Sequence, residues 1–475
     1  MANGQIDPVA DTGVCGDGVG LRRPGAVLLV SCYELGRQPL GVAWPAGFLR
    51  RAGFHPRCRD VAVETLSRKD LQSAEVVVIS VPMHTAMQLG RQVARLARDV
   101  NPDCRLVFQG LYAVLNATSL ERSYDAVCLG GESESRLVEW LESLDRGEQC
   151  SGSDLVGLER QAFPVPDRST LPPVETYAAL EHRDENGQVV HATAGVVESS
   201  RGCRYLCTHC PIPPVYGGRF VAVPLDVVLA DVGQQVDAGA RHITFADPDF
   251  LNGPRHAARV AEALHARWPD VTFDFTAKIE HLVQRGDVLG DLVVCGATFV
   301  ISAVESLSDH VLQVLDKGHS RADVENALQR CRDAGLPMRP TWVPFTPWAS
   351  LDDYHDILRF VVERQLVRHI DPVQFSIRLL VPPGSLLEQH EEFLPHRQEL
   401  DEENLSWGWV HPDDRMDHLA KEVAKIVERS AEKSQSPVET FREIADAAGC
   451  DLMDESLESL VDSRPAPRMT EDWFC

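Results

Sequence analysis

Three cysteines stand close together near the middle of the chain and carry its clearest chemical signal. Cys203, Cys207 and Cys210 have the spacing C-x3-C-x2-C within the segment SSRGCRYLCTHC. With 13 cysteines in 475 residues, this spacing would arise by chance in only about one chain in a hundred. Thiolates are soft ligands that suit zinc or an iron–sulfur cluster. We expect these cysteines to hold a 4Fe–4S cluster whose fourth iron has no protein ligand and can bind a cofactor or substrate.

A single zinc ion is the alternative reading of the same segment. His209 precedes Cys210 and could serve as the fourth ligand of a zinc knuckle. The chain would then be a zinc-bound structural or regulatory protein on an enzyme fold without activity. The Arg201-Gly202 pair before the first cysteine, and the position of the loop after a predicted strand, favour the cluster.

Composition limits the class of protein. The 13 cysteines are an odd number, and the N-terminal segment MANGQIDPVADTG lacks the basic-then-apolar order of a signal peptide. Both observations predict a cytoplasmic protein without a disulfide framework. Lys and Arg number 46 against 71 Asp and Glu, a net charge of −25, which argues against sequence-independent nucleic-acid binding. No apolar run approaches the length of a membrane span, so we expect no membrane partner.

The elements that must position the cysteines begin with a front domain over residues 23–145. Residues 1–22 are rich in Gly and Asp and are predicted to be disordered. Short apolar runs then alternate with helical patterns, which predicts a doubly wound, Rossmann-like α/β domain with its ligand edge at the C-terminal ends of the strands. The predicted strands cover residues 26–30, 55–63, 75–81, 104–108 and 125–129.

A second alternation follows a Pro- and Gly-rich linker predicted over residues 146–190. Residues 191–385 carry six strand patterns separated by helical ones, which predicts a partial (β/α)6 barrel of the TIM type. The six are 194–199, 242–246, 272–276, 298–303, 338–345 and 373–380. The cysteine loop comes directly after the first of them. Residues 386–460 are predicted to be helical without a strong strand, and residues 461–475 to be a flexible tail.

The cysteine spacing after the first strand of a partial barrel resembles the radical S-adenosylmethionine (SAM) enzymes. The resemblance spans roughly residues 191–385. Tyr205 stands one place before the usual aromatic position, which Leu206 occupies. Segments that resemble the strand ends of the family are ITFADPDF (243–250), TAKI (276–279), ISAVES (301–306), VLDKGH (314–319) and VPPGS (381–385). The resemblance implies that SAM chelates the open iron, that an electron donor such as ferredoxin or flavodoxin reduces the cluster, and that a C–S bond then breaks.

The same resemblance implies residues that hold SAM. Asp247 and Asp249 are candidates for its amino group or ribose, Ser302 and Glu305 for the ribose or carboxylate, and Lys278 for the carboxylate. An acidic residue at the end of a strand can instead serve only as a helix N-cap.

The front domain resembles the cobalamin-binding domain of class B radical SAM methyltransferases. Tyr33, Gly36 and Gly41 fall where that domain has its first loop, and Gly131 and Glu132 where it has a late G-E-x-E loop. The cobalt-ligand motif Asp-x-His-x-x-Gly is absent. Either cobalamin is bound without a protein ligand, or the domain has kept the fold and lost the corrinoid.

The last residue, Cys475, follows the segment SRPAPRM and Trp473-Phe474. This end resembles a group of radical SAM proteins whose tails continue as Cys-Cys-Ala-Glu-Pro or Cys-selenocysteine-Ala-Glu-Pro. The resemblance implies that Cys475 is a catalytic thiol and that the gene continues through a selenocysteine codon, which would make the protein a selenoprotein.

These patterns together predict an enzyme that cleaves SAM and modifies a small molecule, by methylation or a related addition of a carbon radical. A second reaction remains open, in which the 3-amino-3-carboxypropyl group of SAM is transferred to a soft acceptor such as arsenite. Modification of tRNA is less favoured because of the net charge of −25.

Overall fold

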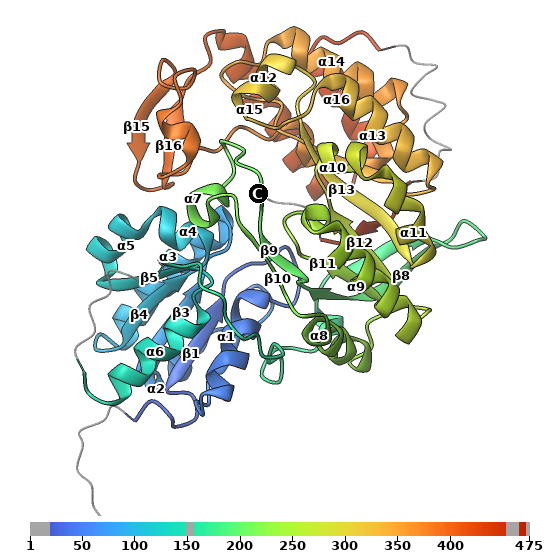
Figure 1. Ribbon diagram of the computed structural model, residues 1–475. Helices are drawn as coiled ribbons and strands as arrows, with labels where there is room; N and C mark the ends of the chain where they lie inside the picture. The colour runs from blue at the N-terminus through green and yellow to red at the C-terminus, as the bar shows by residue number, and fades with distance from the viewer. Residues whose placement is uncertain (1–19, 149–155, 453–464, 472–475) are drawn as a thin grey trace, which may run out of the picture.

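The computed structural model describes residues 20–148, 156–452 and 465–471. The disorder predicted for residues 1–19 lies outside this part of the chain. Residues 20–22 differ from the prediction: Leu21 is buried, and its backbone N–H donates to Asp145 Oδ1 at 2.9 Å. The front domain and the barrel lie side by side, and the C-terminal helices pack beyond the barrel (Figure 1).

The front domain contains a six-stranded parallel sheet in the order β2-β1-β3-β4-β5-β6. This confirms the predicted doubly wound fold. Its strands are β1 (Val27–Ser31), β2 (Arg57–Asp60), β3 (Val76–Ser80), β4 (Arg105–Gln109), β5 (Ala126–Gly131) and β6 (Val156–Gly157). The sixth strand falls within the predicted linker, because a strand of two residues is too short to produce a recognisable sequence pattern.

Helices cover both faces of this sheet, which explains why its strands are continuously apolar rather than alternating. In β1, Leu28 and Val30 join the core beneath α3, whereas Val27 and Leu29 join the core beneath α1 and α6. The helices are α1 (Leu40–Arg51), α2 (Arg68–Ser73), α3 (His84–Val100), α4 (Leu111–Leu115), α5 (Ala117–Tyr124) and α6 (Glu134–Asp145). The strand C-termini are left at one open edge.

The second sheet has the order β14-β13-β12-β11-β8-β7-β17, and the five strands from β8 to β14 are parallel. Its strands are β7 (Ala179–Arg183), β8 (Val189–Val197), β11 (His242–Phe245), β12 (Thr272–Thr276), β13 (Ala297–Glu305), β14 (Met338–Trp342) and β17 (Arg468–Met469). The helices after β8 are α8 (Leu225–Asp237), α9 (Pro254–Arg267), α10 (Ile279–Gln284), α11 (Leu289–Val294), α12 (Asp309–Val314), α13 (Arg321–Asp333) and α14 (Leu351–Glu363). The partial barrel is thereby confirmed.

The sixth predicted strand, residues 373–380, is not a regular strand. Pro372–Phe375 forms a 3-10 turn, η5, and its N–H groups bond within the turn, from Gln374 to Asp371 and from Ser376 to Val373. Only a single bridge joins this segment to the end of the β14 segment, between Phe345 and Arg378. Because the turn uses the donors that a strand would offer to β14, a continuous ladder cannot form.

Two antiparallel strands extend the barrel sheet beyond β8. The first, β7, lies in the range predicted as linker and forms a hairpin with β8. The second, β17, belongs to the predicted flexible tail and pairs with β7. The tail also reaches the opposite edge of the sheet, where Arg339 of β14 donates to the carbonyl oxygen of Pro467 at 3.4 Å. The segment around β17 therefore spans the open side of the barrel.

The C-terminal region contains a strand pair that its sequence did not indicate. β15 (Arg397–Asp401) and β16 (Ser406–Trp409) form an antiparallel hairpin ahead of helices α15 (Asp414–Glu432) and α16 (Pro437–Ala447). The hairpin packs on the front domain (Figure 1): Leu405 joins the core of that domain. Its strands were missed because RQELD is polar and charged, with only Leu400 apolar.

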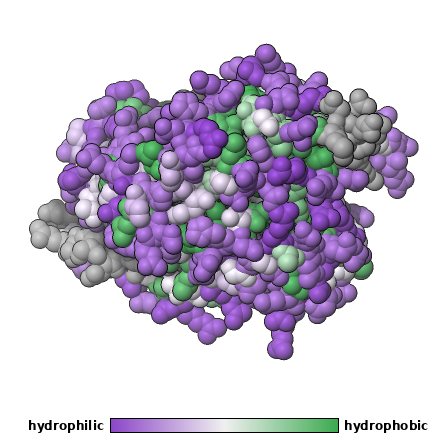
Figure 2. Space-filling model, turned by 90° about the horizontal axis from the view of Figure 1, so that it is seen from above, coloured by the Kyte–Doolittle hydropathy of each residue, from purple (hydrophilic) through white to green (hydrophobic). Residues whose placement is uncertain are grey.

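The remaining elements are short. They are β9 (Ser200–Gly202), α7 (Pro213–Tyr216), β10 (Phe220–Ala222) and the 3-10 turns η1 (Val174–Thr176), η2 (Phe250–Asn252), η3 (Gly286–Val288), η4 (Val367–His369) and η6 (Leu386–Gln389). Among the described residues, none of the helices combines the length and apolar character needed to cross a bilayer. The face shown in Figure 2 is mostly hydrophilic, in keeping with the charged composition.

Candidate active site

The three cysteines lie in the loop between β9 and α7. The middle of this loop is tied to the later part of the barrel: Thr208 donates its N–H to Leu315 O at 3.1 Å and its hydroxyl to Val314 O at 2.9 Å. Cys207 is buried, whereas Cys203 and Cys210 are half-buried. Burial raises the pKa of Cys210 to about 12 in the ligand-free protein, so its thiolate needs a metal or a cation to stabilise it.

Asp247, at the end of β11, fixes the start of the cysteine loop. Its carboxylate accepts hydrogen bonds from the Ser199 N–H at 2.7 Å, the Ser199 hydroxyl at 2.7 Å and the Ser200 hydroxyl at 2.6 Å. Burial raises its pKa to about 6, although the two serines oppose the shift. Asp247 thus positions the loop, and its contact with SAM stays a prediction.

Asp249 has the N-cap role considered above and also ends a buried polar relay. It accepts from the Leu251 N–H at 3.0 Å as the N-cap of η2, and from His281 Nδ1 at 2.7 Å. The other ring nitrogen of His281 lies 3.0 Å from the Tyr205 hydroxyl. Tyr205, one place before the usual aromatic position, is therefore held by a histidine of α10, the helix that follows β12.

Two buried lysines supply positive charge beside the cysteines. Lys278 Nζ lies 3.6 Å from Cys207 Sγ and 3.5 Å from the centroid of the Tyr205 ring. Burial lowers the pKa of Lys317, but attraction by Glu305, and after it by Cys207 and Cys210, raises that pKa above its usual value. Cations at these places favour thiolates over thiols, so the donor set fits a cluster held by three thiolates.

His209 uses one ring nitrogen for a contact with β13, while its Nδ1 is buried without a hydrogen-bond partner among the described residues. Its Nε2 lies 3.2 Å from Glu305 Oε1, which also accepts from Lys317 Nζ at 3.1 Å. Among the described residues, no three His, Cys, Asp or Glu side chains are grouped for a single metal ion. A zinc knuckle needs four ligands around one ion, whereas a 4Fe–4S cube spreads three thiolates over three irons.

Glu305 and Ser302, both on β13, were predicted to contact SAM. Lys317 and His209 hold the pKa of Glu305 far below its usual value despite burial. The residue also has a left-handed backbone, φ 67°, at the point where the register with β14 shifts, and such conformations in non-glycine residues cluster at functional sites. The Ser302 hydroxyl donates to Ala277 O at 2.7 Å in a fully buried position. This hydrogen bond joins β13 to the residue that follows β12, and contact of Ser302 with SAM stays a prediction.

Arg201 joins the cysteine loop to the front domain. It makes ion pairs with Glu134 at 2.8 Å, Glu198 at 2.7 Å and Glu132 at 3.3 Å. Glu132, predicted to bind a cofactor, also accepts from the Tyr216 hydroxyl of α7 at 3.2 Å. Glu132 and Glu134 are the two glutamates of the late G-E-x-E loop, so that loop is bound to the residue two places before Cys203.

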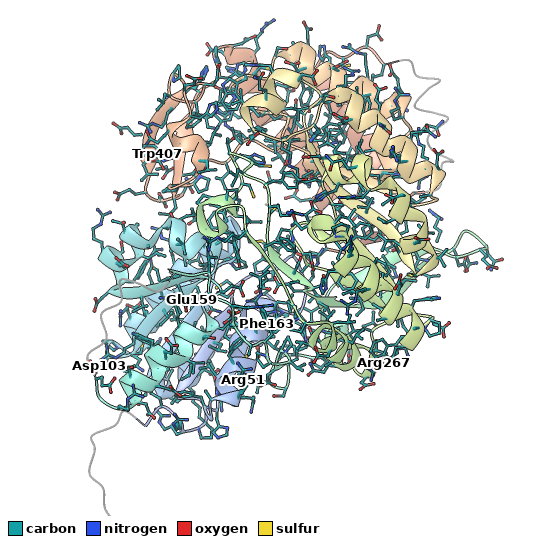
Figure 3. The ribbon with its side chains drawn as sticks, viewed as in Figure 1. Arg51, Asp103, Glu159, Phe163, Arg267 and Trp407 are labelled. Atoms are coloured by element: carbon teal, nitrogen blue, oxygen red, sulfur yellow. The ribbon has the colours of Figure 1, made fainter. Side chains whose placement is uncertain are left out.

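Aromatic rings cover the same junction. The Arg201 guanidinium lies over Trp44 of α1 at 4.8 Å and over Phe163 at 5.1 Å, and the two rings meet edge to face at 5.4 Å. Figure 3 shows Phe163 between the front domain and the barrel. The network buries one cation among three carboxylates and two rings, which makes the junction specific in geometry.

A cavity of about 310 Å³ opens beside this junction. Its walls come from the loops at the strand C-termini of the front sheet, from the barrel, and from the cysteine loop itself. Residues that line it include Glu34, Arg37, Gly41, Trp44, Ser80, Gln109, Gly110, Leu111, Gly131, Glu198, Arg201, Gly202, Tyr216 and Ala246. The predicted residues Gly41 and Gly131 thus lie at the cavity, while Glu132 lies behind it.

The two predicted glycines of the cavity have physical reasons to be glycine. The Glu34 carboxylate accepts from the Leu40 and Gly41 N–H groups at 2.9 and 3.0 Å, so a Cβ at Gly41 would come within 2.5 Å of it and 2.1 Å of Ser80 Oγ. Gly131 has φ +69°, and a Cβ there would lie 2.4 Å from Gly157 O. Both glycines let backbone and acceptor approach closely.

Tyr33 and Gly36, also predicted to bind a cofactor, contact the tail instead. The Tyr33 hydroxyl donates to Glu471 Oε1 at 3.1 Å, and a Cβ on Gly36 would lie 2.7 Å from the Glu471 side chain. Cys475, predicted to be a catalytic thiol, lies outside the described residues. No sequence pattern singled out Glu34 or Arg37, and the only signal for Arg201 was its place before the first cysteine.

Sequence comparison identifies the barrel. Residues 197–358 match the Radical SAM superfamily. An uncharacterized methyltransferase of Pyrococcus horikoshii is 22% identical over 370 residues, which are 74% of this chain and 78% of that protein. The hopanoid C-3 methylase of Methylococcus capsulatus is 24% identical over 73% of this chain and 67% of its own. A tRNA-2-methylthio-N(6)-dimethylallyladenosine synthase of Aliivibrio fischeri is 21% identical over 66% of this chain, and the match spans only 63% of that enzyme.

Solved structures share the arrangement of both domains. The cobalamin-dependent radical SAM enzyme OxsB, with aqua-cobalamin and SAM bound, superposes with a TM-score of 0.63 over 92% of this chain and 70% of its own, at 14% identity. The radical SAM methyltransferase TsrM from Kitasatospora setae gives a TM-score of 0.55 over 71% of this chain and 70% of its own, also at 14% identity. The chain is therefore an enzyme with a radical SAM domain at residues 197–358, behind a front domain that shares its fold with OxsB.

Proposed function

We propose that this radical SAM enzyme is a cobalamin-dependent methyltransferase that acts on a small molecule. Cys203, Cys207 and Cys210 would hold the 4Fe–4S cluster, SAM would lie at the C-terminal ends of the barrel strands, and a corrinoid would occupy the cavity between the domains. The observation that carries the proposal is the composition of the cavity wall. Strand-end residues of the front sheet line one space together with Ile212 of the cysteine loop and with Gly202 and Tyr216, which flank that loop.

The lining of the cavity favours a corrinoid bound without a protein ligand to cobalt. The lining residues include no histidine or cysteine, which agrees with the absent Asp-x-His-x-x-Gly motif. Trp44, Leu40 and Val196 supply apolar surface, and Ser80 and Gln109 supply polar groups at the sheet edge. Apolar walls with a few placed polar groups are typical of cofactor sites.

The residues of the chain prepare this chemistry by position and charge. Bound together, the cluster, SAM and corrinoid would supply electron transfer and the methyl group. Lys278 and Lys317 stabilise the thiolates, Asp247 fixes the loop that carries them, and the Arg201 network holds that loop against the front domain. The relation to a hopanoid methylase and to TsrM supports methylation of a small molecule.

The test uses the full chain, loaded anaerobically with iron, sulfide and hydroxocobalamin and reduced through flavodoxin. A methyltransferase of this kind should retain one corrinoid per chain after desalting and convert SAM to S-adenosylhomocysteine and 5′-deoxyadenosine. Release of 5′-methylthioadenosine instead would favour transfer of the 3-amino-3-carboxypropyl group to a soft acceptor.

A variant that narrows the cavity tests corrinoid binding independently of cluster binding. Leu111→Trp adds volume at the sheet edge of the cavity, away from the cysteines. It should lower corrinoid retention while the absorbance near 400 nm and the iron content stay unchanged. If wild-type protein keeps its cluster but retains no corrinoid, methylation through methylcobalamin is excluded.

A further inference from the structure

One cation in the interdomain cavity has no partner. The Arg37 side chain lines the cavity, and its Nε is buried without a hydrogen-bonding partner. Across the part of the chain that the structure describes, its guanidinium makes no hydrogen bond or ion pair. The side chain as a whole is half-buried, and a partly desolvated charge without a partner is still unfavourable, so such a group needs an explanation.

The loop that carries Arg37 is held firmly, so the missing partner is not the result of a loose segment. Leu35 and Gly36 are both left-handed, with φ of 54° and 63°. Gly36 O accepts from the Ala178 N–H at 2.8 Å, and Gln38 on the other side accepts from Arg168 at 2.9 Å and donates to Pro172 O at 2.9 Å. Only the guanidinium of Arg37 is left free.

None of the surrounding acids among the described residues makes a direct ion pair with Arg37, although Asp274 attracts it. Glu34, on the same loop, has its pKa raised to about 8 by burial and by Asp60, so it is mostly protonated at neutral pH. Asp274 on β12 already accepts from His242 at 2.9 Å and from Thr244 at 2.6 Å. Glu134 and Glu198 are paired with Arg201. The cavity therefore offers a positive charge at Arg37 that the described residues leave without an anion.

The loop that carries Arg37 lies against the barrel. Its neighbour Gly36 contacts Ala178 and Glu471, which lie at the β7–β17 edge of the barrel sheet, and Asp274 is the acid that attracts Arg37 most. A group bound there would lie between the sheet edge, where the corrinoid is proposed, and the barrel strand ends, where SAM is proposed.

We propose that Arg37 binds an oxyanion of the substrate, a carboxylate or a phosphate-type group, and so selects anionic small molecules. This inference rests on the proposed function, because it places the substrate in the cavity between corrinoid and SAM. A guanidinium pairs with both oxygens of such a group at once, which gives orientation as well as affinity.

The test measures the accessibility of Arg37 directly. The cluster-loaded full chain is treated with phenylglyoxal, which modifies unpaired guanidinium groups, and each arginine is followed by peptide mass spectrometry. Inorganic phosphate and acetate, at constant ionic strength, should slow modification of Arg37 by about tenfold, as expected for a charge-assisted pair. Exposed Arg95 on α3 is the control and should not change, and neutral acetamide should protect neither residue. Equal modification rates at Arg37 with and without both anions would overturn the proposal.

A second arm separates the substrate from the corrinoid, which carries a phosphodiester of its own. Arg37→Gln should retain hydroxocobalamin and cobinamide, which lacks that phosphodiester, as well as the wild type does. If Arg37→Gln loses hydroxocobalamin but keeps cobinamide, the oxyanion belongs to the corrinoid and the proposal is wrong. If the wild type retains no corrinoid while phosphate still protects Arg37, the proposed cofactor fails and the anion site stands.

Discussion

Two arginines line the same cavity in opposite states. Arg201, beside the cysteine loop, is surrounded by three carboxylates and two aromatic rings. Arg37, on the β1–α1 loop, has no partner among the described residues. A buried cation whose partners come from the chain fixes structure, whereas one without them is available to a ligand. Arg201 therefore stabilises the junction between the domains, whereas Arg37 is the arginine of the cavity that we propose binds a ligand.

The largest effect is expected from the cysteine variants, which should remove the function of the cysteine loop and leave that of the front domain unchanged. Cys203→Ala, Cys207→Ala and Cys210→Ala should each abolish the cluster and all SAM cleavage, because each thiolate would hold a different iron. Corrinoid retention should remain, since its proposed walls are untouched. Iron content, absorbance near 400 nm and SAM products are the measurements. Cys295→Ala, a half-buried cysteine outside the loop, is the control, and about four irons per chain in all three loop variants would contradict the assignment.

Removal of Arg201 should destabilise the junction strongly. Arg201→Met leaves Glu132, Glu134 and Glu198 buried together without a counter-charge, and breaking a buried ion pair in this way costs about 3–5 kcal/mol of unfolding free energy. Urea unfolding measures the loss. Arg364→Met removes a half-exposed arginine paired with Glu325 at 3.2 Å and should cost about 1 kcal/mol or less. Similar losses in the two variants would mean that Arg201 is not a structural centre.

The pH dependence of the unfolding free energy should reveal the protonation of Glu34, which lines the same cavity as the two arginines. Its pKa is raised by burial from 4.5 to about 8, so the folded chain holds a proton that the unfolded chain has lost. The contribution of Glu34 to the unfolding free energy is therefore most favourable below pH 4.5, and it falls as the pH rises from 4.5 toward 8. Glu34→Gln should reduce this fall by at least about 1 kcal/mol between pH 5 and 8. An unchanged slope in urea unfolding at several pH values would count against a protonated Glu34.

The smallest effect sharpens the contrast with Arg201. Arg37→Met removes a half-buried cation that makes no side-chain hydrogen bond or ion pair among the described residues, so the unfolding free energy should stay within about 1 kcal/mol of the wild type or rise. Urea unfolding beside the Arg201→Met variant gives the comparison directly. A loss of unfolding free energy as large as that of Arg201→Met would show that Arg37 has a structural partner. The two arginines would then have the same role.

The sequence predicted those parts of the molecule in which local pattern decides the structure. Continuous apolar runs such as VLLV in β1 indicate a strand covered on both faces, and the cysteine spacing indicates its chemistry by itself. The hairpin β15–β16 could not be read in this way, because its stability comes from Leu405 in the core of a domain almost 300 residues earlier in the chain. Tertiary contacts there override a polar pattern.

The structure gives contacts for the predicted site residues that the sequence did not indicate, and their roles in binding SAM stay predictions. Strand-end acids such as Asp247 and Asp249 were expected to face a cofactor, and in the structure they hold the cysteine loop and a histidine. Sequence spacing shows that a carboxylate stands at a strand end but not which donor its oxygens meet. Arg37 was invisible for the same reason, since the absence of a partner is a property of three dimensions.

The strand that spans the open side of the barrel has a consequence for how the enzyme is made. Arg339 and Pro467, which meet there, are 128 residues apart in the chain, and the three cysteines come before both. A ribosome therefore exposes the front domain, the cysteine loop and the parallel strands before it releases β17. During that interval the outer edge of β7 has no partner strand, because its only partner on that side among the described residues is β17. The barrel sheet is therefore completed by one of the last described segments of the chain, after all of its parallel strands have been made.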